Sequence, residues 1–345
     1  MRAWPDLIGR LITGEDLDRE DTAWAMDQVM SGQTPPTVLA GFLTALAAKG
    51  ETIAELRGLA DAMLGHARPI NVDSDCLDIV GTGGDRMRTV NISTTAALVI
   101  AATGIKVVKH GNRAASSSSG SADCLQALGV NLDLDPKRVA EVADEVGMTF
   151  LFANLFHPSM RHAAVARREL GVPTAFNLLG PLTNPARPRA TAIGCYSAHK
   201  APIIAGVLAE RGTEALVFRG ENGMDELSAV ARNQVWEVRS GEVAYREIDA
   251  SELGLKPVTV DDLRGADAEY NAGVTAAVLD GQEGPVRDAV LLNAAGGIVA
   301  DARHKDLTGD TLDERLRSGI DIAAEAIDSG AARQLLDNWV AHTRE

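Results

Sequence analysis

Residues 77–113 read LDIVGTGGDRMRTVNISTTAALVIAATGIKVVKHGNR and contain two strand patterns, each followed by a loop of small and polar residues. Residues 77–80 predict a strand, residues 94–103 an apolar, alanine-rich helix, and residues 105–108 a second strand. A further helix is predicted at 122–128. This β-loop-α-β-loop-α order indicates a parallel sheet with right-handed crossovers.

The alternation returns later in the chain. A strand is predicted at 191–195, a helix at 201–211 and a strand at 215–218. Residues 234–238 and 242–248, joined at Ser240-Gly241, predict an antiparallel hairpin. The predicted fold class is therefore α/β, with a small helical N-terminal domain and a larger domain whose central, mainly parallel sheet is surrounded by helices.

The N-terminal part carries only helical patterns. One helix is predicted at 21–30, and Thr34 with the two following prolines predicts the cap and first turn of the next. Thr52 and Glu55 form a capping-box pattern that starts a third. We therefore expect a helical domain at 1–70 and a catalytic α/β domain at 71–345.

A proline-rich break interrupts the strand and helix alternation. Residues 173–189 hold four prolines, and we expect neither a helix nor a central strand there. We interpret residues 171–190 as a stiff connector that packs near the helical domain, and ligand clefts tend to lie beside such connectors.

Composition limits the class of function. The 345 residues are 46% hydrophobic, carry a formal charge of −15 and include three widely spaced cysteines, too few for a disulfide framework. No apolar run is as long as a membrane helix requires. We expect a soluble, cytoplasmic protein without affinity for nucleic acid or membranes, because binding either needs basic residues to neutralise phosphates.

Two loops are suited to binding an anion. Residues 81–85 (GTGGD) and 109–121 (KHGNRAASSSSGS) follow strands, so glycine amides and helix N-termini meet where open α/β sheets bind ligands. Residues 81–113 include five basic residues and one acid, a local charge of +4. Asn91, Ser93 and Thr94 open the helix between the loops and are candidates to cap it. The adjacent acids Asp225 and Glu226 suit Mg²⁺, which one or two carboxylates, water and substrate phosphates usually hold.

Six motifs together resemble one family. They are GTGGD at 81–85, NIST at 91–94, KHGNRAASS at 109–117, FHPSMRH at 156–162, NLLGPLTNP at 177–185 and MDELS at 224–228. In this order the set resembles the anthranilate phosphoribosyltransferase family of tryptophan biosynthesis, and the similarity extends over the whole chain. The resemblance implies a Mg²⁺-dependent glycosyltransferase that transfers the phosphoribosyl group of 5-phosphoribosyl 1-diphosphate to the amine of anthranilate, releasing pyrophosphate. It also implies a homodimer formed through the helical domains.

The resemblance also implies a set of site residues. Phosphoribosyl diphosphate would meet Gly81, Gly84, Asp85, Thr89, Asn91, Ile92, Ser93, Thr94, Lys109, His110, Gly111, Asn112, Arg113, Ala114, Ala115, Ser116, Ser117 and Ser121. Magnesium would be held by Ser93, Asp225 and Glu226. Anthranilate would meet Gly81, Asn112 and Arg167, with His157 near its access path. No residue is assigned as a general base, since the aromatic amine is already neutral at pH 7.

Two positions depart from the family pattern, and other functions stay open. Ser118 stands where relatives often have lysine, and Met160 where some have an aromatic residue. A pyrimidine nucleoside phosphorylase shares the fold and similar loops, but Asp85, Asn112 and Arg167 favour the anthranilate enzyme. A relative with another aromatic or base acceptor and a non-catalytic regulatory relative are the remaining alternatives.

Overall fold

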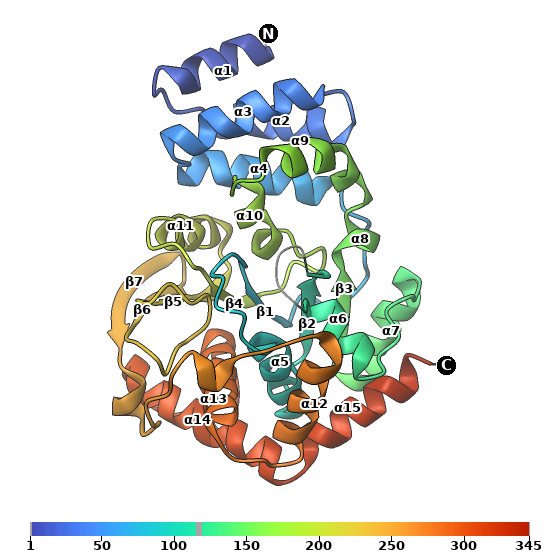
Figure 1. The fold of residues 1–345 in the computed structure, drawn as a ribbon, viewed down its shortest axis with the longest axis vertical. Coiled ribbons are helices and arrows are strands. Elements are labelled where there is room, and N and C mark those ends of the chain that lie inside the picture. The colour runs from blue at the N-terminus through green and yellow to red at the C-terminus, as the bar shows by residue number, and fades with distance from the viewer. Residues whose placement is uncertain (1, 115–118, 345) are drawn as a thin grey trace.

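The computed structural model describes residues 2–114 and 119–344. A helical bundle that contains the N-terminus stands on one face of an α/β domain (Figure 1). No helix within the described ranges is both long and apolar enough to cross a membrane.

The bundle is built from α1 (Trp4–Ile12), α2 (Arg19–Met30), α3 (Pro36–Lys49) and α4 (Ile53–Gly65). Nearby side chains cap the N-termini of α2 and α4. Asp18 accepts a hydrogen bond from Asp21 N at 2.7 Å to cap α2. The predicted capping box at α4 is confirmed, because Thr52 Oγ1 and the Glu55 carboxylate each accept from the other residue's backbone N–H.

Within the described residues, seven strands form one sheet in the order β3-β2-β1-β4-β5-β6-β7. Their bounds are β1 (Leu77–Gly81), β2 (Val107–Gly111), β3 (Met148–Phe152), β4 (Ala190–Gly194), β5 (Glu214–Gly220), β6 (Asn233–Arg239) and β7 (Glu242–Ile248). Strands β1 to β5 are parallel to one another. Strand β6 is antiparallel to both of its neighbours, β5 and β7, which confirms the predicted hairpin. After β1 the chain adds β2 on one side of the sheet, and after β4 it adds β5 on the other side. The strand order therefore reverses between β1 and β4, which is where such sheets bind ligands.

Helices cover both faces of the sheet (Figure 1). Apolar side chains of β1, β2 and β5 pack on one face with α5 (Ile92–Ala102), α13 (Pro285–Asp301), α14 (Leu312–Asp328) and α15 (Ala331–His342). On the other face, Ile193 and Val217 belong to a core shared by α11 (Ala201–Arg211) and the helical bundle. The remaining longer helices are α6 (Ser121–Ala127), α7 (Pro136–Val146) and α12 (Ala268–Leu279).

One segment of the α/β domain crosses into the bundle. It comprises α8 (Ala153–Phe156), a 3₁₀ turn (Pro158–Ala163) and α9 (Ala164–Leu170), and Figure 1 shows α9 lying beside the bundle helices. The chain returns through α10 (Phe176–Leu179) and a second 3₁₀ turn (Gly180–Leu182). Two further 3₁₀ turns span Ala250–Leu253 and Asp261–Leu263.

Two local predictions are wrong. α3 has Pro35 as its N-cap, and Thr34 Oγ1 finds no hydrogen-bond partner among the described residues. The connector at 173–189 does contain short helices, α10 and the turn after it. Pro181 fits the start of that turn because this position needs no amide donor.

Candidate active site

Glycines at the ends of β1 and β4 let an acidic loop cross the sheet edge. Gly81 and Gly194 are register partners on neighbouring strands. A β-carbon on Gly194 would overlap the backbone carbonyl of Asp225, and one on Gly81 would overlap the Asp225 carboxylate. The loop after β5 therefore rests directly on the two strand ends, at the point where strand order reverses.

Hydrogen bonds tie the acidic pair to the first loop and to the following helix. Gly83 N donates to Asp225 Oδ2 at 2.6 Å, and Ser93 N donates to Glu226 Oε1 at 3.2 Å. Burial raises the pKa of Asp225 well above its usual value, and the carboxylates of Asp85 and Glu226 raise it further. Burial likewise raises the pKa of Glu226 to about 7, against the opposing charge of Lys109.

These acids fit a magnesium ion that substrate completes. Over residues 2–114 and 119–344, no group of three or more His, Cys, Asp and Glu side chains forms a cation cage by itself. Asp225 and Glu226 are nevertheless less than one-tenth exposed, and the Glu226 carboxylate adds to the raised pKa of Asp225, so a cation beside the two acids would relieve this repulsion. Two carboxylates with open positions for water and phosphate oxygens suit Mg²⁺.

The N-terminus of α5 faces this acidic pair through its backbone. Asn91 occupies the N-cap position, but the expected side-chain cap is absent from the described hydrogen bonds of α5. Its Oδ1 instead accepts from Asn271 Nδ2 at 2.8 Å and from Ser119 Oγ at 3.2 Å. Ile92 packs into a small core with Val90, its N–H donates to Val90 O at 2.8 Å, and Thr94 is buried.

The second loop begins inside β2, because Lys109, His110 and Gly111 pair with β3 and extend the predicted strand. Lys109 is 1% exposed, and its Nζ donates to Ile79 O. A β-carbon on Gly111 would overlap Ser121 Oγ, which donates to Asn112 O at 3.3 Å. These contacts pack the start of α6 closely against the end of β2.

Asp123 fastens the base of the second loop. Its carboxylate accepts from Ala114 N at 2.9 Å, from Gly120 N at 3.0 Å and from Arg113 Nη1 at 2.9 Å. Asp123 was not among the sequence-predicted residues, although an acid three positions after the N-cap residue is a capping signal. Ala115, Ser116 and Ser117, together with Ser118, lie outside the described residues.

The predicted positive charge of residues 81–113 is only partly directed to the two loops. Lys106 precedes β2 and pairs with Asp144 at 2.7 Å, so it lies at the opposite edge of the sheet from the loops. Arg113 is half-exposed and paired with Asp123. Of the five basic residues, Lys109 is the one whose charge is buried beside the acidic pair.

A second group of side chains lies between the strand ends and the bundle. His110 Nδ1 contacts Gly180 O at 3.1 Å, and its ring centroid is 5.1 Å from that of His157. Burial lowers the pKa of His110 to about 3, with the neighbouring His157 adding to the effect, so both rings are neutral near pH 7. His157 Nε2 contacts Thr183 O at 2.8 Å.

Arg167 of α9 lies beside Phe176 of α10. Its guanidinium carbon lies 5.2 Å from the centroid of the Phe176 ring, and burial lowers its pKa. The described salt bridges give the Arg167 guanidinium no acidic partner. The adjacent Arg168, in contrast to Arg167, is exposed. A half-buried, unpaired guanidinium beside an aromatic ring suits a planar aromatic carboxylate.

Three other residues complete the walls. Gly84 lies against Tyr196, whose ring is 3.5 Å from where a β-carbon on Gly84 would stand. Asp85 Oδ1 accepts from Met87 N at 3.1 Å and so turns the loop. Thr89 forms an isolated antiparallel β-bridge with Arg264. Tyr196 and Gly194 were missed in the sequence, where only the position of glycine at the end of a predicted strand signals the second.

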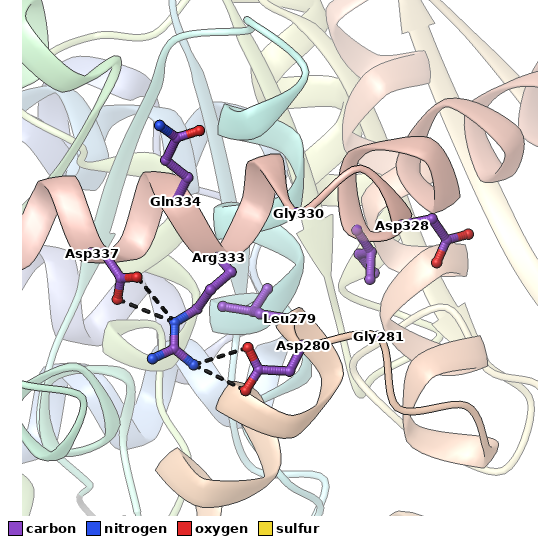
Figure 2. Close-up of a pocket in the computed structure, with 9 residues that line it drawn as sticks. Leu279, Asp280, Gly281, Asp328, Gly330, Arg333, Gln334 and Asp337 are labelled. Carbon is purple, nitrogen blue, oxygen red and sulfur yellow. Dashed lines mark hydrogen bonds and ion pairs between the residues drawn. The ribbon is translucent and has the colours of Figure 1, made fainter.

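A separate hollow on the surface is not part of this site. It has a volume of about 430 Å³ and lies between the ends of α12, α14 and α15 (Figure 2). Arg333 within it is held by Asp280 and Asp337, both at 3.0–3.1 Å, which leaves its charge neutralised. The hollow is at the far end of α12 from Asn271, the residue of that helix that contacts Asn91.

Comparison with known families matches both parts of the chain. Residues 73–333 match the a/b domain of a glycosyl transferase family, and residues 5–67 match its helical bundle domain. An anthranilate phosphoribosyltransferase of Arthrobacter sp. (strain FB24) is 58% identical, over 99% of this chain and 96% of the relative. That of Streptomyces griseus is 57% identical, over 99% and 95%.

Solved structures agree. The crystal structure of anthranilate phosphoribosyltransferase from Thermus thermophilus superposes with a TM-score of 0.91 at 44% identity, over 99% of this chain and 100% of the other. The Saccharomyces cerevisiae enzyme in complex with PRPP and Mg superposes with a TM-score of 0.88 at 28% identity, over 99% of this chain and 98% of the other. The same yeast enzyme in complex with 4-fluoroanthranilate superposes with a TM-score of 0.86 at 26% sequence identity, over 99% of each chain. The chain therefore belongs to the anthranilate phosphoribosyltransferase family, and phosphoribosyl transfer to anthranilate is its function.

Proposed function

We propose that three loops of this enzyme form one site for phosphoribosyl diphosphate: the glycine loop after β1, the end of β2 with Lys109, and the acidic loop after β5. The observation that carries this assignment is the pair of hydrogen bonds from Gly83 N and Ser93 N to the Asp225 and Glu226 carboxylates. They join the glycine loop and the N-terminus of α5 to the acidic loop. Backbone amides and a helix N-terminus stabilise phosphate groups.

Within this site, the residues we assign to phosphoribosyl diphosphate are those predicted from the sequence. Gly84, Asp85 and Asn91 to Thr94 line one wall, and Lys109 supplies a buried cation for the diphosphate. Asn112, Arg113 and Ser121 stand at the base of the second loop. Thr89 contributes through the backbone segment that precedes α5.

We assign magnesium to Asp225 and Glu226, with Ser93 beside them. The S. cerevisiae relative was solved in complex with PRPP and Mg, which supports this assignment. When bound, the ion neutralises negative charge that develops on the departing pyrophosphate. The carboxylates orient the ion, and Gly83 N and Ser93 N fix the carboxylates.

Anthranilate is assigned to the space between α9, α10 and the ends of β1 and β2. Arg167 offers its guanidinium to the carboxylate, and Phe176 packs beneath it. His110 and His157 form a neutral, aromatic wall, and Gly81 and Asn112 lie toward the ribose. The complex of the yeast relative with 4-fluoroanthranilate is consistent with an aromatic carboxylate ligand.

The site accelerates the reaction mainly by position and charge. The neutral amine attacks the anomeric carbon of the ribose as the bond to pyrophosphate breaks, so negative charge accumulates on the leaving group. We assign Lys109 and the N-terminus of α5 to the stabilisation of that charge. Holding amine and sugar together removes the entropy cost of their encounter.

We also propose a homodimer in the cytoplasm, with a domain boundary near residue 70. Ile12, at the end of α1, is 72% exposed, and Val165 of α9 is 37% exposed on the same bundle, which supports association through that domain. The three cysteines are buried and free, as in a reducing compartment. Sedimentation equilibrium of the purified chain should give twice its mass of 36.3 kDa. A single-chain mass would contradict the dimer.

The activity is tested by following anthranilate fluorescence. Purified protein with Mg²⁺ and phosphoribosyl diphosphate should consume anthranilate, and omission of either should stop the loss. A pyrimidine nucleoside phosphorylase would instead cleave thymidine or uridine with inorganic phosphate. Phosphorolysis without anthranilate consumption would contradict the function.

A further inference from the structure

The neighbouring strands β1 and β2 separate toward their carboxyl ends. They share a single register pair, Leu77 with Val107, whereas β1 pairs with β4, and β2 with β3, along five residues each. Backbone groups that face the resulting opening cannot bond to the opposite strand. Such buried groups need other partners.

Asp78 and Asn184 supply those partners. Asp78 is 0% exposed, and its Oδ1 accepts from His110 N at 3.1 Å. Asn184 Nδ2 donates to Asp78 Oδ2 at 2.9 Å and to Val108 O at 2.8 Å, and Asn184 Oδ1 accepts from Ala186 N at 2.9 Å. The two side chains thus join β1, β2 and the connector across the opening.

Lys109 enters the same opening from β2. Its Nζ donates to the Ile79 carbonyl of β1, one residue beyond Asp78. Burial lowers the pKa of Lys109, while Asp78 and Glu226 both act to keep it protonated. In turn the lysine opposes the effect of burial, which raises the pKa of Asp78 to about 6. The lysine charge is therefore stabilised by a carboxylate of β1 and by one of the acidic loop.

We propose that Asp78 is a positioning residue for phosphoribosyl transfer: its buried carboxylate anchors the end of β2 and gives Lys109 a fixed counter-charge. The inference rests on the proposed assignment of Lys109 to the diphosphate. Without Asp78, the charge left to balance the lysine is Glu226, which we assign to magnesium. Lys109 would then turn toward the acidic pair and away from phosphate.

Inorganic pyrophosphate, the reaction product, is the probe. Calorimetry at fixed Mg²⁺ should give a Kd about tenfold higher for Asp78→Asn than for the wild type, the size typical of a lost charged contact. The KM for phosphoribosyl diphosphate should rise similarly, and the KM for anthranilate should stay within about twofold. A purely structural role for Asp78 would change both KM values together.

Asn184→Ala is the matched control, because it breaks the same connection and leaves the charge. It should lower the melting temperature and leave the pyrophosphate Kd within about twofold of the wild type, since no charge near the phosphate is lost. Equal weakening by Asn184→Ala and Asp78→Asn would overturn the proposal.

Lys109→Met separates this inference from the proposed function. Lys109→Met should weaken the binding of pyrophosphate. The double variant with Asp78→Asn should bind pyrophosphate no more weakly than Lys109→Met alone, because the effects of substitutions at coupled residues do not add. If Lys109→Met binds pyrophosphate like the wild type, the assignment of Lys109 fails. If Lys109→Met weakens binding and Asp78→Asn does not, only the role of Asp78 fails.

Folding of the variants gives a second test. Asp78→Asn leaves the lysine without its counter-charge, whereas the double variant removes both buried charges. The double variant should therefore melt at or above the temperature of Asp78→Asn, and a fold recovered only in the double variant would support the pairing. Strictly additive melting shifts, or failure of both variants to fold, would overturn it.

Discussion

Gly83 N donates to Asp225 Oδ2 at 2.6 Å, although 142 residues separate the two in the chain. The bond joins the glycine loop after β1 to the acidic loop after β5 and leaves the second carboxylate, Glu226, to meet Ser93 N. The proposed phosphate-binding backbone and the proposed magnesium ligands are consequently one assembly. A change in either loop should affect both.

Neutralising the acidic pair should impair catalysis without unfolding the enzyme. In Asp225→Asn with Glu226→Gln, both side chains keep an oxygen for Gly83 N and Ser93 N, but the charge is lost. We expect kcat/KM to fall about a hundredfold or more, since charge stabilisation by a metal ion is worth several kcal/mol. Stability without Mg²⁺ should be unchanged or higher, because burial raises the pKa of both acids and the Asp85 carboxylate raises each further.

The measurement is the initial rate as a function of Mg²⁺ concentration, together with a urea unfolding curve. Glu221→Gln is the control, because it removes an exposed acid from the same loop. An unchanged magnesium dependence in the double variant would contradict the metal assignment.

Arg167→Ala should chiefly raise the KM for anthranilate. A charged hydrogen bond contributes about 1.5–3 kcal/mol, so we expect an increase of roughly 10- to 100-fold and little change in the KM for phosphoribosyl diphosphate. Arg168→Ala removes the same charge from an exposed neighbour and should leave both constants near wild type. If the two variants behave alike, Arg167 does not bind the carboxylate.

Gly194→Ala should displace the acidic loop. Its new methyl group would overlap the Asp225 carbonyl, and such overpacking costs about 1–3 kcal/mol. Activity should fall with stability, because Asp225 can move only by leaving Gly83. Gly273→Ala is the matched control. Gly273 lies on the exposed side of α12, away from the helix ends, and a β-carbon added there would have no neighbouring atom within 4 Å. This substitution should stabilise the protein by about 0.5–1 kcal/mol. Retention of full activity in Gly194→Ala would contradict the loop placement.

Acid should reduce the stability that His110 contributes. Its pKa is lowered to about 3 in the folded protein, against about 6.5 when unfolded, so below pH 6.5 the unfolded state binds more protons. The free energy of unfolding should therefore fall on acidification, by up to about 1.4 kcal/mol per pH unit from this group.

His110→Asn provides the comparison, since it cannot take up that proton. The difference in unfolding free energy between the wild type and this variant should shrink from pH 7.5 to pH 4.5. Asp78 has the opposite sign, because its pKa is raised, but it is present in both proteins and cancels from the difference. Parallel curves would mean that His110 takes up its proton equally in the folded and unfolded states, which would contradict the lowered pKa.

Much of the fold could be predicted because its signals are local. The capping box at Thr52, the helix at 201–211 and the hairpin at Ser240-Gly241 each depend on neighbouring residues, and each is confirmed. The helix at Trp4–Ile12 and the strand at Met148–Phe152 were missed, although the helix has an amphipathic pattern with Leu7 and Leu11 buried. The strand is a short apolar run, which periodicity alone does not identify.

The site could be predicted in composition but not in geometry. Motifs located Asp225, Glu226 and Lys109, yet only the fold reveals that Lys106 points to the opposite edge of the sheet. The role of Asp78 depends on a gap between two strands, and Gly194 matters because a distant loop crosses it. Register and loop crossings are set by long-range packing, so the residues nearby do not encode them.

A crystal structure of the wild-type enzyme with phosphoribosyl diphosphate and Mg²⁺ tests the central claim most directly. The account predicts diphosphate density between the glycine loop and Lys109, with a cation against Glu226 and Asp225. Diphosphate density elsewhere, or a cation that touches neither carboxylate, would contradict the proposed site.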